Sequence, residues 1–90
     1  MKYQIINSAP DGRFVRTFKK LSSAATYFEE MSGFTIEQAL SERYFMDGQV
    51  PTFDQVEGVS AVSMFGNVIA IRKIVSDFDA DGNLEKLVIN

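Results

Sequence analysis

The amino-acid sequence predicts an α+β fold, in which an antiparallel sheet of about five strands carries a pair of helices on one face. Three observations lead to this prediction. Short runs rich in β-branched and aromatic residues lie towards both ends of the chain, two segments with helical periodicity lie between them, and glycine-containing turns separate neighbouring runs. The predicted order is strand, strand, helix, helix, strand, strand, strand. This order gives two layers, because the helices and the sheet bury their apolar sides against each other.

The first two predicted strands, residues 3–8 and 13–18, flank the four-residue turn APDG. Pro10 fixes φ for the second position of a type I turn, Asp11 suits the third position, and Gly12 accepts the left-handed conformation that follows. These features predict a β-hairpin with a glycine bulge.

Two amphipathic helices are predicted in the middle of the chain. In the first, apolar residues recur at helical spacing, Ser22 or Ser23 is the expected N-cap, and Gly33 follows the last turn. In the second, Thr35 and Gln38 have the spacing of a capping box, in which the side chain of each residue bonds to the backbone N–H of the other. The two helices are joined by a short link, so they are expected to pack as a pair.

The remainder of the chain is predicted to supply three strands. In the stretch at residues 59–75, a Gly-Asn turn at residues 66–67 separates two strands, and this register pairs Met64 with Ile69 in the core. LEKLVIN, residues 84–90, is predicted to be the last strand.

The composition limits the functional classes. The chain has 90 residues, of which 46% are hydrophobic and 23% charged, so residues 1–90 are expected to form a single domain. It contains no Cys and no His, which excludes disulfides, thiolate zinc sites and imidazole-assisted nucleophiles. We assign no catalytic residue and expect no cofactor. Because no apolar run has the length of a signal peptide core or a membrane span, a cytoplasmic location is predicted.

Charge is unevenly distributed along the chain, whose net charge is −3. Residues 1–20 hold five basic residues and one acidic residue, a net charge of +4, whereas residues 21–58 hold one basic and seven acidic residues, a net charge of −6. Concentrated negative charge favours association with a basic surface. The predicted contact residues are the glutamates of the two helices, Glu29, Glu30, Glu37 and Glu42.

These features favour a small acidic protein-interaction module without enzymatic activity. The hypothesis is an inhibitor or regulator of a basic partner protein that handles nucleic acid, by analogy with the small antagonists of phages and mobile elements. The alternative is a nucleic-acid-binding protein, because basic and aromatic residues alternate in the first hairpin. Its contact residues are Arg13, Arg16, Lys19 and Lys20. An enzyme that uses carboxylates alone is a third and weaker hypothesis.

The sheet is also predicted to have a second apolar face, which is a candidate homodimer surface. In the predicted register this face comprises Val59, Ala61, Phe65, Val68 and Ile74. Both apolar faces of the sheet must then be buried against another part of the chain or against a partner.

The stretch DFDADGN, residues 77–83, resembles the start of an EF-hand calcium loop, with Asp77, Asp79 and Asp81 at alternate positions. The twelfth position of the loop is Val88 instead of a bidentate glutamate, and the flanking segments are strand-like instead of helical. The stretch is therefore interpreted as a tight turn, with weak calcium binding as the alternative, and no metal site is assigned.

Overall fold

The computed structural model describes residues 1–74, so the strand predicted at residues 84–90 and the acidic run at residues 77–83 lie outside the described part of the chain. The described residues form an α+β fold with a four-stranded antiparallel sheet in the order β2-β1-β4-β3. The strands are β1 (Lys2–Ala9), β2 (Gly12–Phe18), β3 (Gly58–Val62) and β4 (Val68–Ile74). The helices are α1 (Leu21–Ser32) and α2 (Ile36–Tyr44), with 3-10 turns η1 (Phe45–Asp47) and η2 (Phe53–Gln55).

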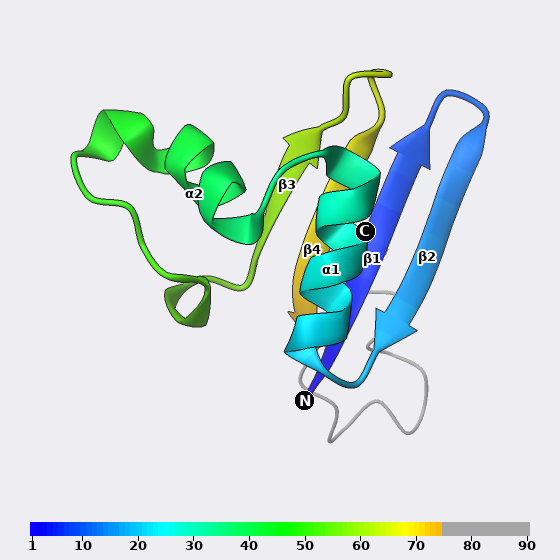
Figure 1. Ribbon diagram of the computed structural model, residues 1–90, viewed down its shortest axis with the longest axis horizontal. Helices are drawn as coiled ribbons and strands as arrows, with labels where there is room; N and C mark the ends of the chain where they lie inside the picture. The colour runs from blue at the N-terminus through cyan, green and yellow to red at the C-terminus, as the bar shows by residue number, and fades with distance from the viewer. Residues whose placement is uncertain (75–90) are drawn as a thin grey trace.

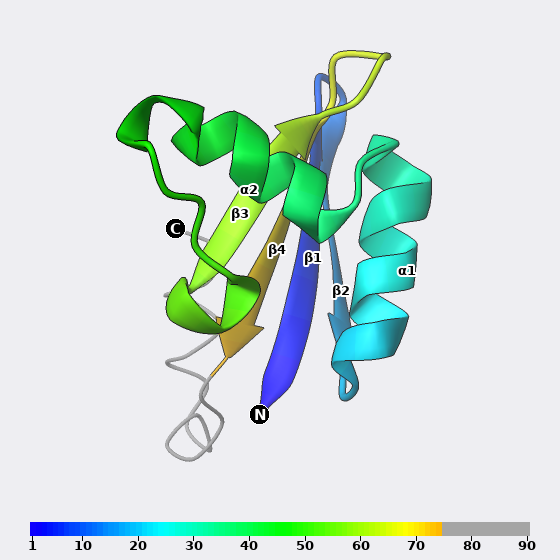
Figure 2. The same ribbon diagram turned by 60° about the vertical axis from the view of Figure 1, so that its left-hand side comes forward.

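Both helices lie on the same face of the sheet, as the sequence predicts (Figure 1, Figure 2). α1 packs against β4, β1 and β2, whereas α2 packs against β3. α2 and η1 extend past β3 on the side away from β4 (Figure 1). The two-layer arrangement is confirmed, with four strands among the residues that the structure describes.

The first hairpin is confirmed, but its expected bulge is not. β1 and β2 pair without interruption from Tyr3 and Phe18 to Ala9 and Gly12. Gly12 continues the ladder opposite Ala9, so the connecting loop is shorter than the predicted turn and no residue is left over for a bulge.

The second helix begins as predicted, and the first does not. At the start of α2, Thr35 Oγ1 accepts a hydrogen bond from the Gln38 N–H at 3.0 Å, and the Thr35 N–H donates to Gln38 Oε1 at 2.9 Å. α1 instead begins at Leu21, which packs against the core, and no side chain caps it. The predicted Ser22 or Ser23 cap is therefore wrong: the N-cap is Lys20, and the first helical residue, Leu21, is partly buried against the core.

The core lies between the sheet and the helices. Its largest fully buried side chains are Phe28, Ile5, Leu40, Ile69 and Ile71. The η2 turn is attached to the sheet by Lys73 of β4, whose Nζ donates to the Phe53 carbonyl oxygen and lies 4.8 Å from the Phe53 ring centroid. None of the helices among residues 1–74 has the length and apolar character needed to cross a bilayer.

The register of β3 against β4 differs from the prediction. Ala61, instead of Met64, pairs with Ile69, and the loop spans residues 63–67. The difference of three residues is odd, so it exchanges the two faces of β3. Val59 and Ala61 consequently pack towards the helices.

Hydrogen bonds within the loop explain its length. The Ser63 N–H donates to the Asn67 carbonyl oxygen at 2.8 Å, and the Asn67 N–H donates to Ser63 Oγ at 3.2 Å. The Gly66 N–H donates to the Ser63 carbonyl oxygen at 2.9 Å, and Gly66 has a left-handed φ of 85°. The loop therefore closes at Ser63 and Asn67, and the residues between them project away from the core.

Candidate interaction surface

The four predicted contact glutamates are all exposed. Glu29 and Glu30 lie near the end of α1, Glu37 lies in the first turn of α2, and Glu42 lies near the end of α2. The structure brings Glu30 and Glu42 beside one apolar surface, whereas Glu29 and Glu37 do not line it.

This apolar surface lies where the link between α1 and α2 meets the loop between β3 and β4. Two shallow hollows adjoin here, one of about 370 Å³ that includes Glu30 and one of about 450 Å³ that includes Glu42, and both are lined by Phe34 and Val62. We call its exposed apolar residues the Phe34–Val62 patch. They are Met31, Phe34, Val62, Met64 and Phe65.

The exposure of these side chains is large for residues of this type. Met64 is 89% exposed, Phe65 84% and Val62 57%. Single apolar residues on a surface are common, but adjoining ones that form a continuous patch usually mark an interaction site. The patch is therefore the best candidate for a binding surface among the described residues.

Local hydrogen bonds fix the link that carries Phe34. The Gly33 N–H donates to the Glu29 carbonyl oxygen at 2.8 Å, and Gly33 ends α1 with a left-handed φ of 82°. Buried Ser32 donates through Oγ to the Phe28 carbonyl oxygen at 2.7 Å and accepts the Phe34 N–H at 3.1 Å. The capping box then begins α2 immediately after Phe34, so the backbone at this position is held on both sides.

The predicted homodimer residues do not form one face. Val59 and Ala61 pack in the core beneath the helices, whereas Ile74 packs with Ile6 in a separate cluster. Phe65 lies in the loop, and Val68 is 41% exposed. This grouping depended on the predicted register, and the observed register separates its members.

The basic hairpin residues are also divided. Arg13 pairs with Ser8 and Arg16 pairs with Ile5, so the two arginines lie on opposite faces of β2. The Arg16 guanidinium lies 5.3 Å from the Phe18 ring centroid and 5.0 Å from that of Tyr27. Lys19 and Lys20 are exposed where β2 leads into α1. Arg16 thus also serves the packing of α1 on β2, and the four basic residues do not form one continuous surface.

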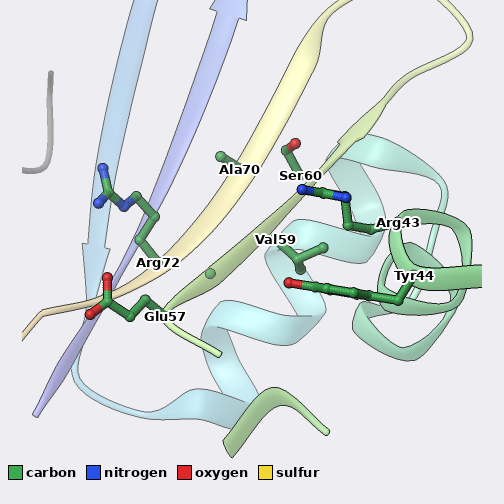
Figure 3. Close-up of a pocket in the computed structure, with 8 residues that line it drawn as sticks. Arg43, Tyr44, Glu57, Val59, Ser60, Ala70 and Arg72 are labelled. Carbon is green, nitrogen blue, oxygen red and sulfur yellow. The ribbon is translucent and has the colours of Figure 1, made fainter. Parts of the chain in front are cut away.

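A further hollow of about 330 Å³ lies beside β3, at the edge of the sheet that α2 overhangs (Figure 3). Arg43 and Tyr44 line it from the end of α2, and residues 57–60 line it from β3 and the segment that precedes it. Figure 3 shows the Arg43 side chain extended towards Ser60. Within residues 1–74, no group of three or more carboxylates is placed to hold a metal ion.

Comparison of the chain with protein-family models, with curated proteins and with solved structures finds no match. The functional argument therefore depends on the described surfaces themselves.

Proposed function

We propose that this protein is a non-enzymatic protein-binding module, which contacts its partner through the Phe34–Val62 patch and the carboxylates beside it. The observation that supports the proposal is the exposure of Met64 and Phe65, at 89% and 84%, on a surface that also carries Glu30 and Glu42. Protein interfaces combine a central apolar area with a polar rim in this way.

The carboxylates at the rim of the patch, Glu30 and Glu42, favour a partner with a basic surface. A basic surface around an apolar site matches the Glu30 and Glu42 carboxylates, and Glu29 and Glu37 add to the negative field of the same helix layer. Rim charges mainly accelerate association and make it sensitive to salt, whereas buried aromatic residues supply most of the affinity. The proposed partner is a basic, nucleic-acid-handling protein, which this chain would regulate or inhibit.

Affinity capture with the full chain as bait tests this proposal. The captured partner is identified by mass spectrometry, purified, and titrated with two variants, Phe65→Ser and Glu30→Lys. Phe65→Ser should weaken binding by at least about fivefold, as for an interface aromatic residue. Glu30→Lys should slow association, and the difference from the unmodified chain should shrink as salt is added.

Two control variants make the same chemical changes elsewhere. Phe45→Ser removes an aromatic side chain that is 67% exposed on η1, and Asp11→Lys reverses an exposed charge in the first hairpin. Both should bind the partner as the unmodified chain does. Equal weakening by the controls contradicts the proposed surface.

A separate binding assay tests the alternative that the protein binds nucleic acid. Fluorescence anisotropy at low salt compares a single-stranded and a duplex oligonucleotide. Binding that is lost in Lys19→Glu and Lys20→Glu, with no captured protein partner, supports the alternative and contradicts the proposal.

A further inference from the structure

β3 has an open hydrogen-bonding edge among the residues that the structure describes. The Glu57 carbonyl oxygen accepts from the Lys73 N–H at 2.9 Å, and the Ser63 N–H donates to Asn67 at 2.8 Å, so the odd-numbered residues of this stretch bond to β4. Backbone groups alternate in direction along an antiparallel strand. The N–H and C=O groups of Gly58, Ser60 and Val62 therefore point away from the sheet, where no described strand pairs with them.

The two edges of the described sheet differ in their charge. β2 carries Arg13 and Arg16, and charged side chains on an edge strand discourage the pairing of further strands. β3, with the sequence GVSAV, carries no charged residue. Ser60 and Val62 of this strand are exposed. This edge is therefore the better acceptor for an added strand.

The two hollows beside β3 form a trough along its edge. α2 and η1 extend over the space beyond the edge (Figure 1). The hollow of about 450 Å³ borders the end of β3 at Val62, the hollow of about 330 Å³ borders its start at Gly58, and Arg43 and Ser60 line both. A second copy that paired through its own β3 would bring its α2 into the same space, which favours a single extended segment as the occupant.

The trough differs in chemistry along its length. Near Val62 it is mainly apolar, with Phe34, Ala39 and Ala61 in its lining beside the Glu42 carboxylate. At its middle, the Arg43 guanidinium lies beside Ser60 (Figure 3). Successive side chains on one side of a strand are two residues apart, about 6.6 Å, which is the separation from Val62 to Ser60 along β3.

We propose that β3 accepts an extended peptide segment of a partner protein as an additional antiparallel strand, with an apolar side chain in the hollow at Phe34 and a carboxylate side chain, two residues away, beside Arg43. The backbone of the segment bonds to Gly58, Ser60 and Val62, which is the β-augmentation mode of peptide recognition. This site shares the hollow of about 450 Å³ with the surface of the proposed function, and it goes beyond that function because it also requires the backbone edge of the sheet and Arg43.

Amide hydrogen exchange on the full-length, ¹⁵N-labelled chain tests the proposal. The probes are capped octapeptides with valine at alternate positions, one of which is replaced by glutamate, serine or lysine. In the free protein the Ser60 and Val62 amides should exchange rapidly, while the Val59 and Ala61 amides are protected by β4. The glutamate peptide should protect Ser60 and Val62, and it should bind about fivefold more tightly than the lysine peptide at low salt.

Variants of two residues separate the backbone contact from the charge contact. Ser60→Pro removes an N–H that does not bond to β4, so the sheet should persist while peptide protection is lost. Ser60→Ala keeps this N–H, so a comparison of the two variants separates the loss of the N–H from the loss of the hydroxyl group. Arg43→Glu leaves the edge intact and should reverse the preference, so that the lysine peptide binds more tightly, and this result does not depend on the folding of Ser60→Pro.

Four results would overturn the proposal. The first is no protection of Ser60 and Val62 at millimolar peptide. The second is an unchanged peptide preference in Arg43→Glu. The third is protection in the free protein that rises with protein concentration, which indicates a second copy. The fourth is protection in dilute free protein, which indicates that this chain covers its own edge. None of them bears on the effect of Glu30→Lys, so this site and the proposed function fail independently.

Discussion

Gly58→Ala should destabilise the protein by steric overlap and not by strain at residue 58, because the φ of Gly58 is not in the left-handed region. A Cβ atom at this position lies 2.6 Å from the Ile71 carbonyl oxygen and 3.1 Å from Arg72 Cγ. The Ile71 oxygen belongs to the backbone of β4, so one of the two strands must move to relieve the contact. Overpacking of this kind costs about 1–3 kcal/mol, and the lower chain entropy of alanine in the unfolded state returns about 0.4–1 kcal/mol. We expect a net loss of roughly 1–2 kcal/mol, since these principles give opposing terms of that size.

Thermal and urea unfolding, followed by circular dichroism, measure this loss. For a domain of this length, each kcal/mol corresponds to about 4–8 °C in Tm, so the expected decrease is roughly 4–16 °C. Ser60→Ala, two residues further along β3 and exposed, is the matched control and should change Tm little. A Gly58→Ala protein as stable as the unmodified chain would refute the steric reasoning, because it would show that β3 and β4 separate at no cost.

Substitutions at three other residues give further predictions. Phe28→Ala removes the largest fully buried side chain and should lower the free energy of unfolding by about 3–5 kcal/mol in urea titrations; a loss below about 1 kcal/mol would contradict the observed core. Thr35→Ala breaks the capping box and should cost about 1 kcal/mol by the same measurement, whereas Thr35→Ser should retain most of it; equal stabilities of the two variants would exclude the cap. Phe65→Ser should leave the unfolding free energy within about 0.5 kcal/mol of its original value, because the side chain is 84% exposed, and a larger loss would place Phe65 in the core.

Where local chemistry determines structure, the sequence was sufficient to predict it. The capping box of Thr35 and Gln38 places the start of α2 because both of its hydrogen bonds form within one helical turn. The first hairpin follows from its turn residues in the same way. The start of α1 was predicted wrongly, because the helix begins without a side-chain cap at Leu21, which packs against core residues from distant parts of the chain.

The register of β3 and β4 shows the same limit. Gly66 and Asn67 are a favourable two-residue turn, but Ser63 and Asn67 form the hydrogen bonds that close the loop. The sequence alone does not distinguish these two ways of closing the loop. In the structure, the observed closure places Val59 and Ala61 in the space beneath the helices. The exposure of the four glutamates was predictable, because the spacing of apolar residues along a helix shows which of its positions face the solvent. The Phe34–Val62 patch was not predicted, because the predicted register places Val62 and Met64 in the core and Phe65 on the second face of the sheet, whereas the observed register leaves all three exposed.

The loop between β3 and β4 has a consequence for the speed of recognition. Ser63 is buried, and its hydrogen bonds with Asn67 hold the backbone beneath Met64 and Phe65 before any partner arrives. A contact surface that is already ordered loses little conformational entropy when a complex forms. Partners of different affinity should then be captured at similar rates, and the lifetime of each complex should distinguish them.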